Sequence, residues 1–150
     1  MKWKYKQLHN IVKEPIKHYQ FTERRTGGSY RSYIFKTIAH PWLAELHAKF
    51  YRGGRKTVPD DIKDMLTPLV LAVWYMDDGS LSKGAPILNT QGYSVEEQFK
   101  LLKALRKFHI IGNINKDRDK YRIRILKRHA KKFAEIIRPY VLPEFAYKLP

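Results

Sequence analysis

The residues from Leu69 to Met76 form an uninterrupted apolar run in which the Tyr75 hydroxyl is the only polar group. Thr67 and Pro68 precede the run and favour a helix start, because Thr can cap the first amides and Pro fits the first turn. At a rise of about 1.5 Å per residue the helix is roughly 12 Å long, which is too short to span a bilayer. A helix that is apolar on all sides must be covered on every side, so the run predicts a buried central helix.

Two carboxylates, Asp77 and Asp78, follow the apolar run directly, and Gly79 then ends the predicted helix. The C-terminal end of a helix carries a partial negative charge, so an anion there costs roughly 0.3–1 kcal/mol unless a cation meets it. The best candidate for that cation is a divalent metal with oxygen ligands. The alternative interpretation is that both residues are ordinary polar groups at a helix end. The buried run before them favours a functional role.

The chain is strongly basic, because 30 Lys and Arg residues stand against 14 Asp and Glu residues, a formal net charge of +16. Such a charge indicates nucleic acid or an anionic membrane as the partner. No stretch pairs a basic helix face with a bulky apolar face, so we predict nucleic acid and no membrane. The absence of cysteine excludes disulfides and thiolate metal sites. Residues 1–6 lack the apolar run of a secretory signal, so we expect a cytoplasmic or organellar-matrix protein that is not secreted.

Before the central helix, the hydrophobic pattern predicts a helix, a hairpin and a second helix. Trp3–Val12 has helical spacing, and two β-rich runs, Ile16–Glu23 and Tyr30–Ile38, flank a Gly-Gly turn that predicts a hairpin. The second helix is expected over Pro41–Tyr51, and Arg52–Lys56 is expected to be a basic loop.

After the central helix, Leu81–Pro86 is expected to be a turn and Ile87–Gln91 a strand. Ser94 and Glu97 have the spacing of a capping box, which predicts the start of a helix. The side chains expected to face inward from that helix are Val95, Phe99, Leu102 and Leu105. A last helix is expected over Arg128–Arg138, where Pro139 stops it. Its apolar face consists of Ala130, Phe133, Ala134 and Ile137.

A second hairpin is predicted over Gly112–Lys116 and Tyr121–Leu126, and its second strand has two chemically different faces. The apolar face, suited to the core, carries Tyr121, Ile123 and Ile125. The cationic face, suited to phosphates and guanine edges, carries Lys120, Arg122 and Arg124. This alternation predicts a sheet that is packed on one face and binds DNA with the other.

Two amides, Asn89 and Gln91, alternate around Thr90, and both can pair bidentately with adenine. Further cations extend the expected DNA-binding surface in both parts of the chain: Lys83, Lys116, Arg118, Arg24, Arg25 and Arg31. The first hairpin also carries Lys17, Tyr19 and Lys36. Any one of these residues is more often a solvated surface group than a base contact, so the prediction rests on the set.

The segment Leu71–Gly79, Leu-Ala-Val-Trp-Tyr-Met-Asp-Asp-Gly, resembles the signature helix of the LAGLIDADG homing endonucleases. The resemblance continues through Ile87–Gln91, Arg138–Pro143 and Tyr147–Pro150, and it is greatest to the C-terminal half of two-motif, intron-encoded members. It implies an α+β fold in which helices back one face of an antiparallel, curved sheet. The signature helix then lies at the interface between two domains or protomers.

The resemblance also implies roles for particular residues. Asp78 matches the acidic residue that binds divalent metal before the signature Gly, and Gly79 belongs to the same metal site. Lys148 matches the C-terminal lysine that assists the attacking water or stabilises phosphate charge. Asp117 falls near the polar position that supports the water network, and Asp77 is expected to be structural. The cofactor that the resemblance implies is Mg²⁺ or another divalent cation.

The resemblance divides the chain into a LAGLIDADG domain over residues 56–150 and a partial N-terminal repeat over residues 1–55. The partial repeat has helix–hairpin–helix form without its own signature helix, because no second helix ending in Asp-Gly occurs in residues 1–68. Two signature helices must pair, so the resemblance implies a homodimer or a complementing half-chain. The interface residues expected on this helix are Leu69, Ala72, Val73 and Met76.

The function implied is that of a site-specific homing endonuclease that hydrolyses phosphodiester bonds of double-stranded DNA with Mg²⁺. A homodimer would require a near-palindromic target, because the DNA copies the two-fold symmetry of the protein. Two alternatives remain open: an intron maturase that binds RNA without cleavage, and a non-catalytic DNA-binding remnant. The 6 histidines show no metal-ligand spacing and add no competing site.

Overall fold

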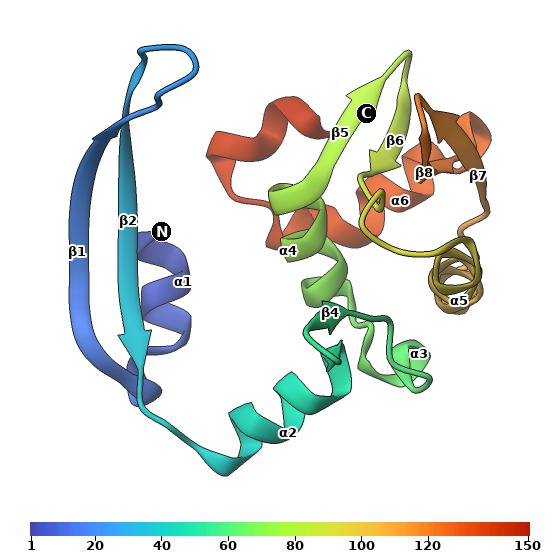
Figure 1. Cartoon of the computed structure of the whole chain (residues 1–150). Helices are drawn as coiled ribbons and strands as arrows, with labels where there is room; N and C mark the ends of the chain where they lie inside the picture. The colour runs from blue at the N-terminus through green and yellow to red at the C-terminus, as the bar shows by residue number, and fades with distance from the viewer. The chain divides into compact units, whose positions relative to one another are not determined.

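The computed structural model describes residues 1–150, which form two compact units, Met1–Leu46 and His47–Pro150 (Figure 1). The division falls within helix α2, Pro41–Phe50. None of the helices is both long and apolar enough to cross a membrane. The assignment of residues 1–55 to a partial repeat stays a prediction.

The first unit contains helix α1, Lys2–Gln7, and the antiparallel hairpin of β1, Val12–Thr22, and β2, Ser29–Thr37. The predicted hairpin is confirmed, but its first strand starts before Pro15, where sequence analysis had placed a helix end. The pairing register shifts on both sides of Glu14, and such irregularities let a strand accommodate proline. The ring of Tyr5 packs edge-on against Phe35 at 5.5 Å, which joins α1 to the hairpin.

No side chain of the first unit is fully buried. Strand pairing and aromatic contacts, such as that of Phe21 with Tyr30 at 6.0 Å between ring centroids, hold the hairpin instead of a core. Large apolar side chains of this unit are therefore exposed, among them Tyr19, Phe21, Tyr30, Tyr33, Ile34 and Trp42.

The second unit begins with a short hairpin of β3, Tyr51–Arg52, and β4, Arg55–Lys56. Sequence analysis predicted a basic loop here, which was wrong. Gly53 and Gly54 both have positive φ, at 56° and 75°, as the tight turns of two-residue hairpins require. The short helix α3, Ile62–Met65, then leads to the central helix α4, Pro68–Asp78, as predicted.

A four-stranded antiparallel sheet follows, with strand order β5-β6-β8-β7. Its strands are β5, Gly79–Ser82; β6, Ala85–Leu88; β7, Gly112–Asp117; and β8, Lys120–Ile125. The hairpin of β7 and β8 confirms the prediction. The turn expected over residues 81–86 is present but shorter than predicted, because β5 and β6 flank a two-residue turn of Lys83 and Gly84. Both turn residues have positive φ, 51° at Lys83 and 72° at Gly84.

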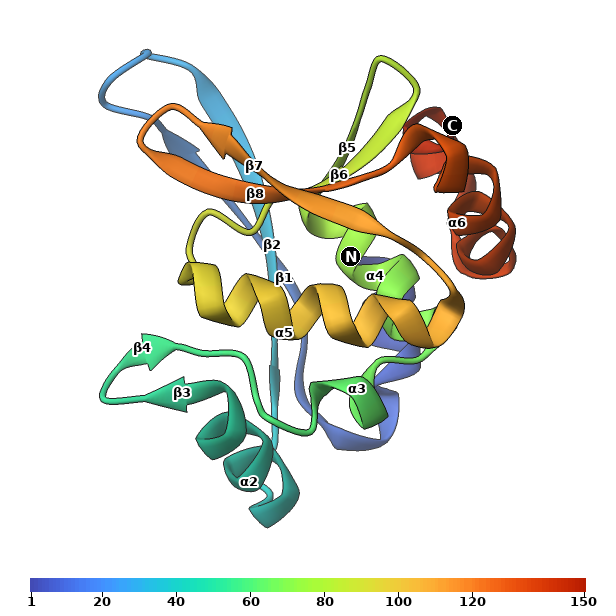
Figure 2. The ribbon, with the colours of Figure 1, turned by 90° about the vertical axis from the view of Figure 1, so that its right-hand side faces the viewer.

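Helices α5, Val95–Leu105, and α6, Ala130–Ile137, pack with α4 against the sheet. Figure 2 shows α5 running lengthwise beneath the β7–β8 hairpin. The rings of Tyr75 and Phe133 meet edge-on at 4.9 Å in the core. A final 3₁₀ helix, η5, Pro143–Lys148, brings the C-terminal segment back to α4.

The predicted inward face of α6 is confirmed, because Ala130, Phe133, Ala134 and Ile137 are all buried. The predicted face of α5 was partly wrong. Phe99 is 53% exposed, and the helix instead buries Gln98, Leu101, Ala104 and Leu105. The helix is rotated toward Gln98 because this amide has buried backbone carbonyls to satisfy.

Candidate active site and nucleic-acid interface

The C-terminal end of α4 presents two exposed carboxylates, Asp77 and Asp78. The helix starts as predicted, with the Thr67 hydroxyl accepting a hydrogen bond from the Val70 amide and Pro68 in the first turn. Gly79 ends the helix with φ of −89°, which any residue can adopt. The need for glycine is steric, because an added Cβ would lie 2.1 Å from Cδ2 of the Tyr75 ring.

Lys148 is brought to this helix end from the C-terminal segment. Its ammonium donates a 2.7 Å hydrogen bond to the carbonyl of Met76, one of the last carbonyls of α4. A cation at this position offsets the negative end of the helix dipole, which the two carboxylates otherwise worsen. The structure therefore unites two predicted catalytic residues, Asp78 and Lys148, at one helix terminus.

Tyr75 holds Lys148 in position. The Tyr75 hydroxyl lies 2.7 Å from the carbonyl oxygen of Lys148 and 3.1 Å from that of Ser80, and it can donate to either. Burial raises the pKa of Tyr75 to about 12, so the hydroxyl keeps its proton at any physiological pH. Sequence analysis assigned no role to the Tyr75 hydroxyl, since nothing local indicates the distant carbonyl.

A cavity of about 270 Å³ lies beside Asp78, and Lys56 and Tyr93 line it together with Trp74. Burial raises the pKa of Tyr93, and the charge of Asp78 raises it further. Lys56 is thus a second cation in the neighbourhood of the carboxylates, and sequence analysis had assigned it to a basic loop. The resemblance of its Lys-Thr-Val-Pro context to the Lys-Leu-Pro at Lys148 is the signal that could have indicated it.

The face of α4 predicted to pair with a second helix is only partly available. Leu69 is 39% exposed and Val73 half-buried, whereas Ala72 and Met76 are buried inside their own unit. These four residues share one side of the helix, and that side lies at the boundary between the buried and the exposed surface of α4. Ala72 therefore packs in the core, and the Met76 sulfur accepts from the Leu142 amide. One side of α4 is exposed in the single chain, so the expectation that the helix is covered on every side stays a prediction that requires a second helix.

The remaining predicted site residues lie on the sheet, where a hydrogen-bond network starts at Asp78. The Asn89 amide donates to the Asp78 carbonyl at 3.1 Å, and the Asn89 side-chain oxygen accepts from Arg122 at 3.3 Å. The Arg122 guanidinium also pairs with Asp117 at 3.3 Å, and the second oxygen of Asp117 accepts from Gln91 at 2.9 Å. Both predicted adenine-reading amides are therefore held by an arginine–carboxylate pair.

Asp117 makes these contacts with Gln91 and Arg122 and not with the end of α4. Its geometry is that of a residue that orients the two base-reading amides, and its predicted catalytic role stays a prediction. Gly79 is buried and pairs with Leu88 at the start of the β5–β6 ladder. Its assignment to the metal site likewise rests on the resemblance alone.

A buried network that sequence analysis missed anchors the segment carrying Asn89 and Gln91. The Thr90 hydroxyl donates to the Gln98 side chain at 3.0 Å and accepts from the Ile123 amide at 3.1 Å. The Gln98 amide group in turn lies 3.0 Å from the Tyr121 carbonyl. A buried, fully paired network of this kind fixes the direction in which the flanking amides point.

The predicted cations of the second unit gather on the two hairpins of the four-stranded sheet. Lys83 lies at the β5–β6 turn, and the others lie on β7, on β8 or at their turn: Lys116, Arg118, Lys120, Arg122 and Arg124. The strand alternation of β8 is confirmed, because Ile123 and Ile125 are buried while the cations remain accessible. Tyr121 is the exception on the apolar side, at 40% exposure.

In the first unit, Arg24 and Arg25 lie in the β1–β2 turn and Arg31 on β2, all exposed. Lys17 and Lys36 both pair with Glu14, at 2.6 and 3.5 Å. The hydrogen bond from Lys17 lowers the pKa of Glu14. These two lysines are thus partly neutralised, and the three arginines are the stronger candidates for phosphate contacts.

A mixed α+β unit with paired carboxylates at the end of an apolar helix, beside a basic sheet face, defines a nucleic-acid-processing protein. A family model described as the LAGLIDADG DNA endonuclease family matches residues 1–133. The chain belongs to this family.

The relatives of this chain include intron-encoded endonucleases and an mRNA maturase. A probable intron-encoded DNA endonuclease 3 of Mycosarcoma maydis is 32% identical over 131 residues, which cover 82% of this chain and 96% of that protein. A cytochrome b mRNA maturase bI2 of Debaryomyces hansenii is 33% identical over 133 residues, 85% of this chain. The chain spans about half the length of this maturase, 50%.

A solved structure, the homing endonuclease I-WcaI bound to its DNA recognition sequence, superposes with a TM-score of 0.91. It is 26% identical, and the match covers 99% of this chain and 70% of that one. The fold predicted from the sequence, a LAGLIDADG homing-endonuclease fold of α+β class, is thereby confirmed.

Proposed function

We propose that the chain is a homing endonuclease that hydrolyses phosphodiester bonds of double-stranded DNA at a specific site. The observation that carries this proposal is the convergence of Asp78 and Lys148 at the end of α4, joined by hydrogen bonds to the basic face of the sheet. The names of the intron-encoded relatives and of the DNA-bound structural neighbour support it.

A divalent cation fits the chemistry of this helix end. Exposed carboxylate oxygens are the ligands that Mg²⁺ prefers, and it is commonly held by one or two carboxylates with water and substrate phosphates. Within this chain no group of three His, Cys, Asp or Glu side chains could enclose a metal alone. Asp78 would therefore hold Mg²⁺ from one side only. Bound there, the metal would supply Lewis-acid stabilisation of phosphate charge.

The residues of the chain have separate tasks in the proposed reaction. Lys148 places a positive charge beside the scissile phosphate and stabilises the negative charge that develops there. Arg122 and Asp117 orient Asn89 and Gln91 toward base edges, which sets the register of the DNA. Arg24, Arg25 and Arg31 add phosphate contacts that hold the duplex without reading it.

A second copy of the α4 helix end is required to complete the site. We propose that the exposed side of α4, with Leu69, Val70 and Val73, packs against the corresponding helix of a second copy or of a complementing half-chain. Burial of such apolar side chains favours association by about 25 cal/mol per Å². Sedimentation equilibrium of the 17.9 kDa chain and of Leu69→Glu tests this step, with Leu81→Glu as an exposed, apolar control.

The deciding experiment compares DNA cleavage and DNA binding in Asp78→Asn. The DNA sequence that the wild-type chain prefers is first selected from a random library in the presence of Ca²⁺. We expect Asp78→Asn to retain that binding and to lose cleavage about 10²–10³-fold in Mg²⁺, because the lost charge acts mainly in the transition state. Asp77→Asn is the matched control with a smaller loss. Cleavage by Asp78→Asn at the wild-type rate would refute the catalytic assignment.

The maturase relative favours one second candidate, an RNA-binding protein that helps its intron fold. The same basic sheet can bind RNA, and Asp78 would then be dispensable. If Asp78→Asn still supported splicing of the intron but no longer cleaved DNA, the chain would have both activities, and only cleavage would need Asp78. Binding that persists in EDTA, with no Mg²⁺-dependent nicking by the wild-type chain, would instead identify a DNA-binding remnant. The intron-encoded relatives support the organellar matrix or the cytoplasm as the compartment of this chain.

A further inference from the structure

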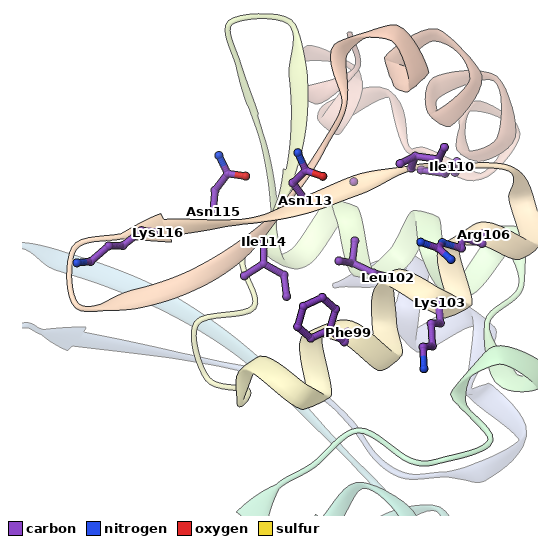
Figure 3. A pocket seen from close by; sticks show the side chains of 11 residues that line it. Phe99, Leu102, Lys103, Arg106, Ile110, Asn113, Ile114, Asn115 and Lys116 are labelled. Carbon is purple, nitrogen blue, oxygen red and sulfur yellow. The ribbon is translucent and has the colours of Figure 1, made fainter.

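A groove of about 690 Å³ lies between α5 and β7, away from the end of α4. Its floor is apolar and is formed by Phe99, Leu102 and Ile114 together with Ile110. Figure 3 shows Ile114 pointing from β7 toward Phe99 and Leu102 of α5. Phe99 is 53% exposed, so the floor is open to a ligand.

One wall of this groove is an unpaired strand edge. β7 is the outermost strand of the sheet and pairs only with β8. Asp117 and Lys120 flank the two-residue turn, so they form a hydrogen-bonded pair, and such pairs alternate along the ladder. It follows that Asn113 and Asn115 direct their backbone groups to β8. Gly112, Ile114 and Lys116 direct theirs outward, where another strand could pair with them.

The rim of the groove has one sign of charge. Lys103 and Arg106 of α5 and Lys116 of β7 line it, and no acidic side chain does. A neutral or basic strand would gain nothing from this rim, whereas an acidic strand would be attracted to it. Lysine at a sheet edge also opposes pairing with a second copy of the same strand, because the two lysines would repel.

We propose that this groove binds an extended, acidic segment of a partner protein, which adds to β7 as a fifth strand. The apolar side chains of the segment would cover Phe99, Leu102 and Ile114, and its carboxylates would meet Lys103, Arg106 and Lys116. Backbone pairing supplies affinity in this mode and the alternate pockets supply specificity. The proposal does not depend on nuclease activity.

Nucleic acid fits this groove less well than a peptide does. The polar face of β7, with Asn113 and Asn115, points away from the groove floor (Figure 3). The floor has a single aromatic ring for base stacking, and a phosphodiester backbone has no apolar groups to cover Phe99 and Ile114. DNA therefore belongs to the opposite face of β7. In this proposal Lys116, which was predicted to bind DNA, lies on the groove side of β7 instead.

The test uses the full chain and two synthetic peptides of about ten residues, one with central Val residues flanked by Glu at both ends and one with Pro in place of each Val, so that apolar and acidic side chains occur on the same face of the strand. Both have the same charge, but Pro lacks the N–H that strand pairing requires. Affinity is measured by fluorescence anisotropy, and amide hydrogen exchange is followed by NMR. We expect the Val-Glu peptide alone to bind and to slow exchange at Ile114 and Lys116.

Two pairs of variants sharpen this test. Ile114→Pro removes one outward N–H, which an edge strand tolerates, and should weaken binding about tenfold or more, while Ile114→Val should not. The double variant Lys103→Glu/Arg106→Glu should weaken binding similarly. Its control, Lys131→Glu/Lys132→Glu, makes the same change in net charge on exposed residues of α6.

Three results would overturn the proposal. The first is equal binding of the Pro-Glu peptide, because charge alone would then explain the affinity. The second is no detectable binding of the Val-Glu peptide to the wild-type chain. The third is slower exchange at the same amides when a single-stranded RNA oligonucleotide is added, with loss of this effect in Lys103→Glu/Arg106→Glu. That result would make the groove a nucleic-acid site.

Discussion

The hydroxyl of Tyr75 lies 2.7 Å from the backbone carbonyl of Lys148, which is 73 positions further along the chain. Through this contact the central helix holds the segment that carries the C-terminal lysine. The Lys148 ammonium in turn donates to the carbonyl of Met76, so two hydrogen bonds join Lys148 to the end of α4. The position of Lys148 relative to Asp78 is therefore set by Tyr75 as well as by the chain itself.

Tyr75→Phe should lower both stability and cleavage. The change removes one buried hydrogen bond and leaves the Lys148 carbonyl unsatisfied, at a cost of about 1–3 kcal/mol in the free energy of unfolding. Because Phe keeps the ring contact with Phe133, we expect a folded protein with reduced kcat and an unchanged affinity for DNA. Urea unfolding and single-turnover cleavage measure the two effects. Tyr140→Phe, an exposed tyrosine, is the control, and an equal loss there would contradict the assignment.

Gly79→Ala should destabilise the second unit by about 1–3 kcal/mol, because the new Cβ would lie 2.1 Å from the ring of Tyr75 and force it to move. The φ of Gly79 is negative, so the expected cost is steric and not conformational. Thermal unfolding measures it. Gly92→Ala is a matched control, since nothing lies within 4 Å of its added Cβ. If both variants unfolded at the same temperature, the ring would not be rigidly held.

Arg122→Ala should weaken specific DNA binding by about 1–3 kcal/mol and relax the preference at the bases nearest Asn89 and Gln91. The guanidinium is bonded to Asn89 and Asp117, so its loss frees both base-reading amides. Affinity for the selected site and for a scrambled site, at several salt concentrations, separates the two effects. The control is Arg138→Ala, which removes an exposed arginine outside the sheet. It should slightly lower the affinity for the selected site and for the scrambled site, by the same factor. A uniform loss in Arg122→Ala would mean that it contacts phosphate only.

Glu97 should make stability depend on pH below its ordinary pKa of 4.5. Burial raises the pKa of Glu97, but hydrogen bonds from the amides of Ser94 and Val58 and the charge of Arg55 outweigh it, so the folded-state pKa is lowered. A lowered carboxylate pKa stabilises the fold above 4.5, and this contribution is lost as pH falls through the folded-state value.

Glu97→Gln should therefore be less stable than the wild type at neutral pH, and the difference should shrink as the pH drops below 4.5. Urea unfolding at a series of pH values measures the difference. Glu135→Gln on the surface of α6, whose side chain is 61% exposed, serves as the control. A difference between wild type and Glu97→Gln that did not change with pH would show that folding does not lower the pKa of Glu97.

Local signals in the sequence were sufficient for much of the fold. Thr67, Pro68 and the apolar run predicted the start and extent of α4, and the spacing of Ser94 and Glu97 predicted the capping box that the structure confirms. Period-two alternation predicted which side chains of β8 are buried. These predictions succeed because caps and strand faces depend on neighbours within a few residues.

The errors arose where distant contacts decided the outcome. The orientation of α5 follows from Gln98, which bonds to carbonyls of Thr90 and Tyr121, and no local pattern indicates these partners. The turn expected over residues 81–86 is limited to Lys83 and Gly84, because its flanking residues pair with each other as β5 and β6. In both places long-range hydrogen bonding and strand pairing overrode the local propensity.

The sequence by itself determined the family, the carboxylates at the end of α4 and the basic character of one sheet face, because these depend on residue type and spacing along one element. Only the tertiary structure decided that Lys148 returns to the carbonyl of Met76 and that Asp117 and Arg122 hold the two amides. It also decided that one side of α4 is exposed while Ala72 and Met76 are buried. The physical reason is that each of these relations joins segments far apart in the chain, where packing and backbone hydrogen bonding, and not local propensity, select the partner.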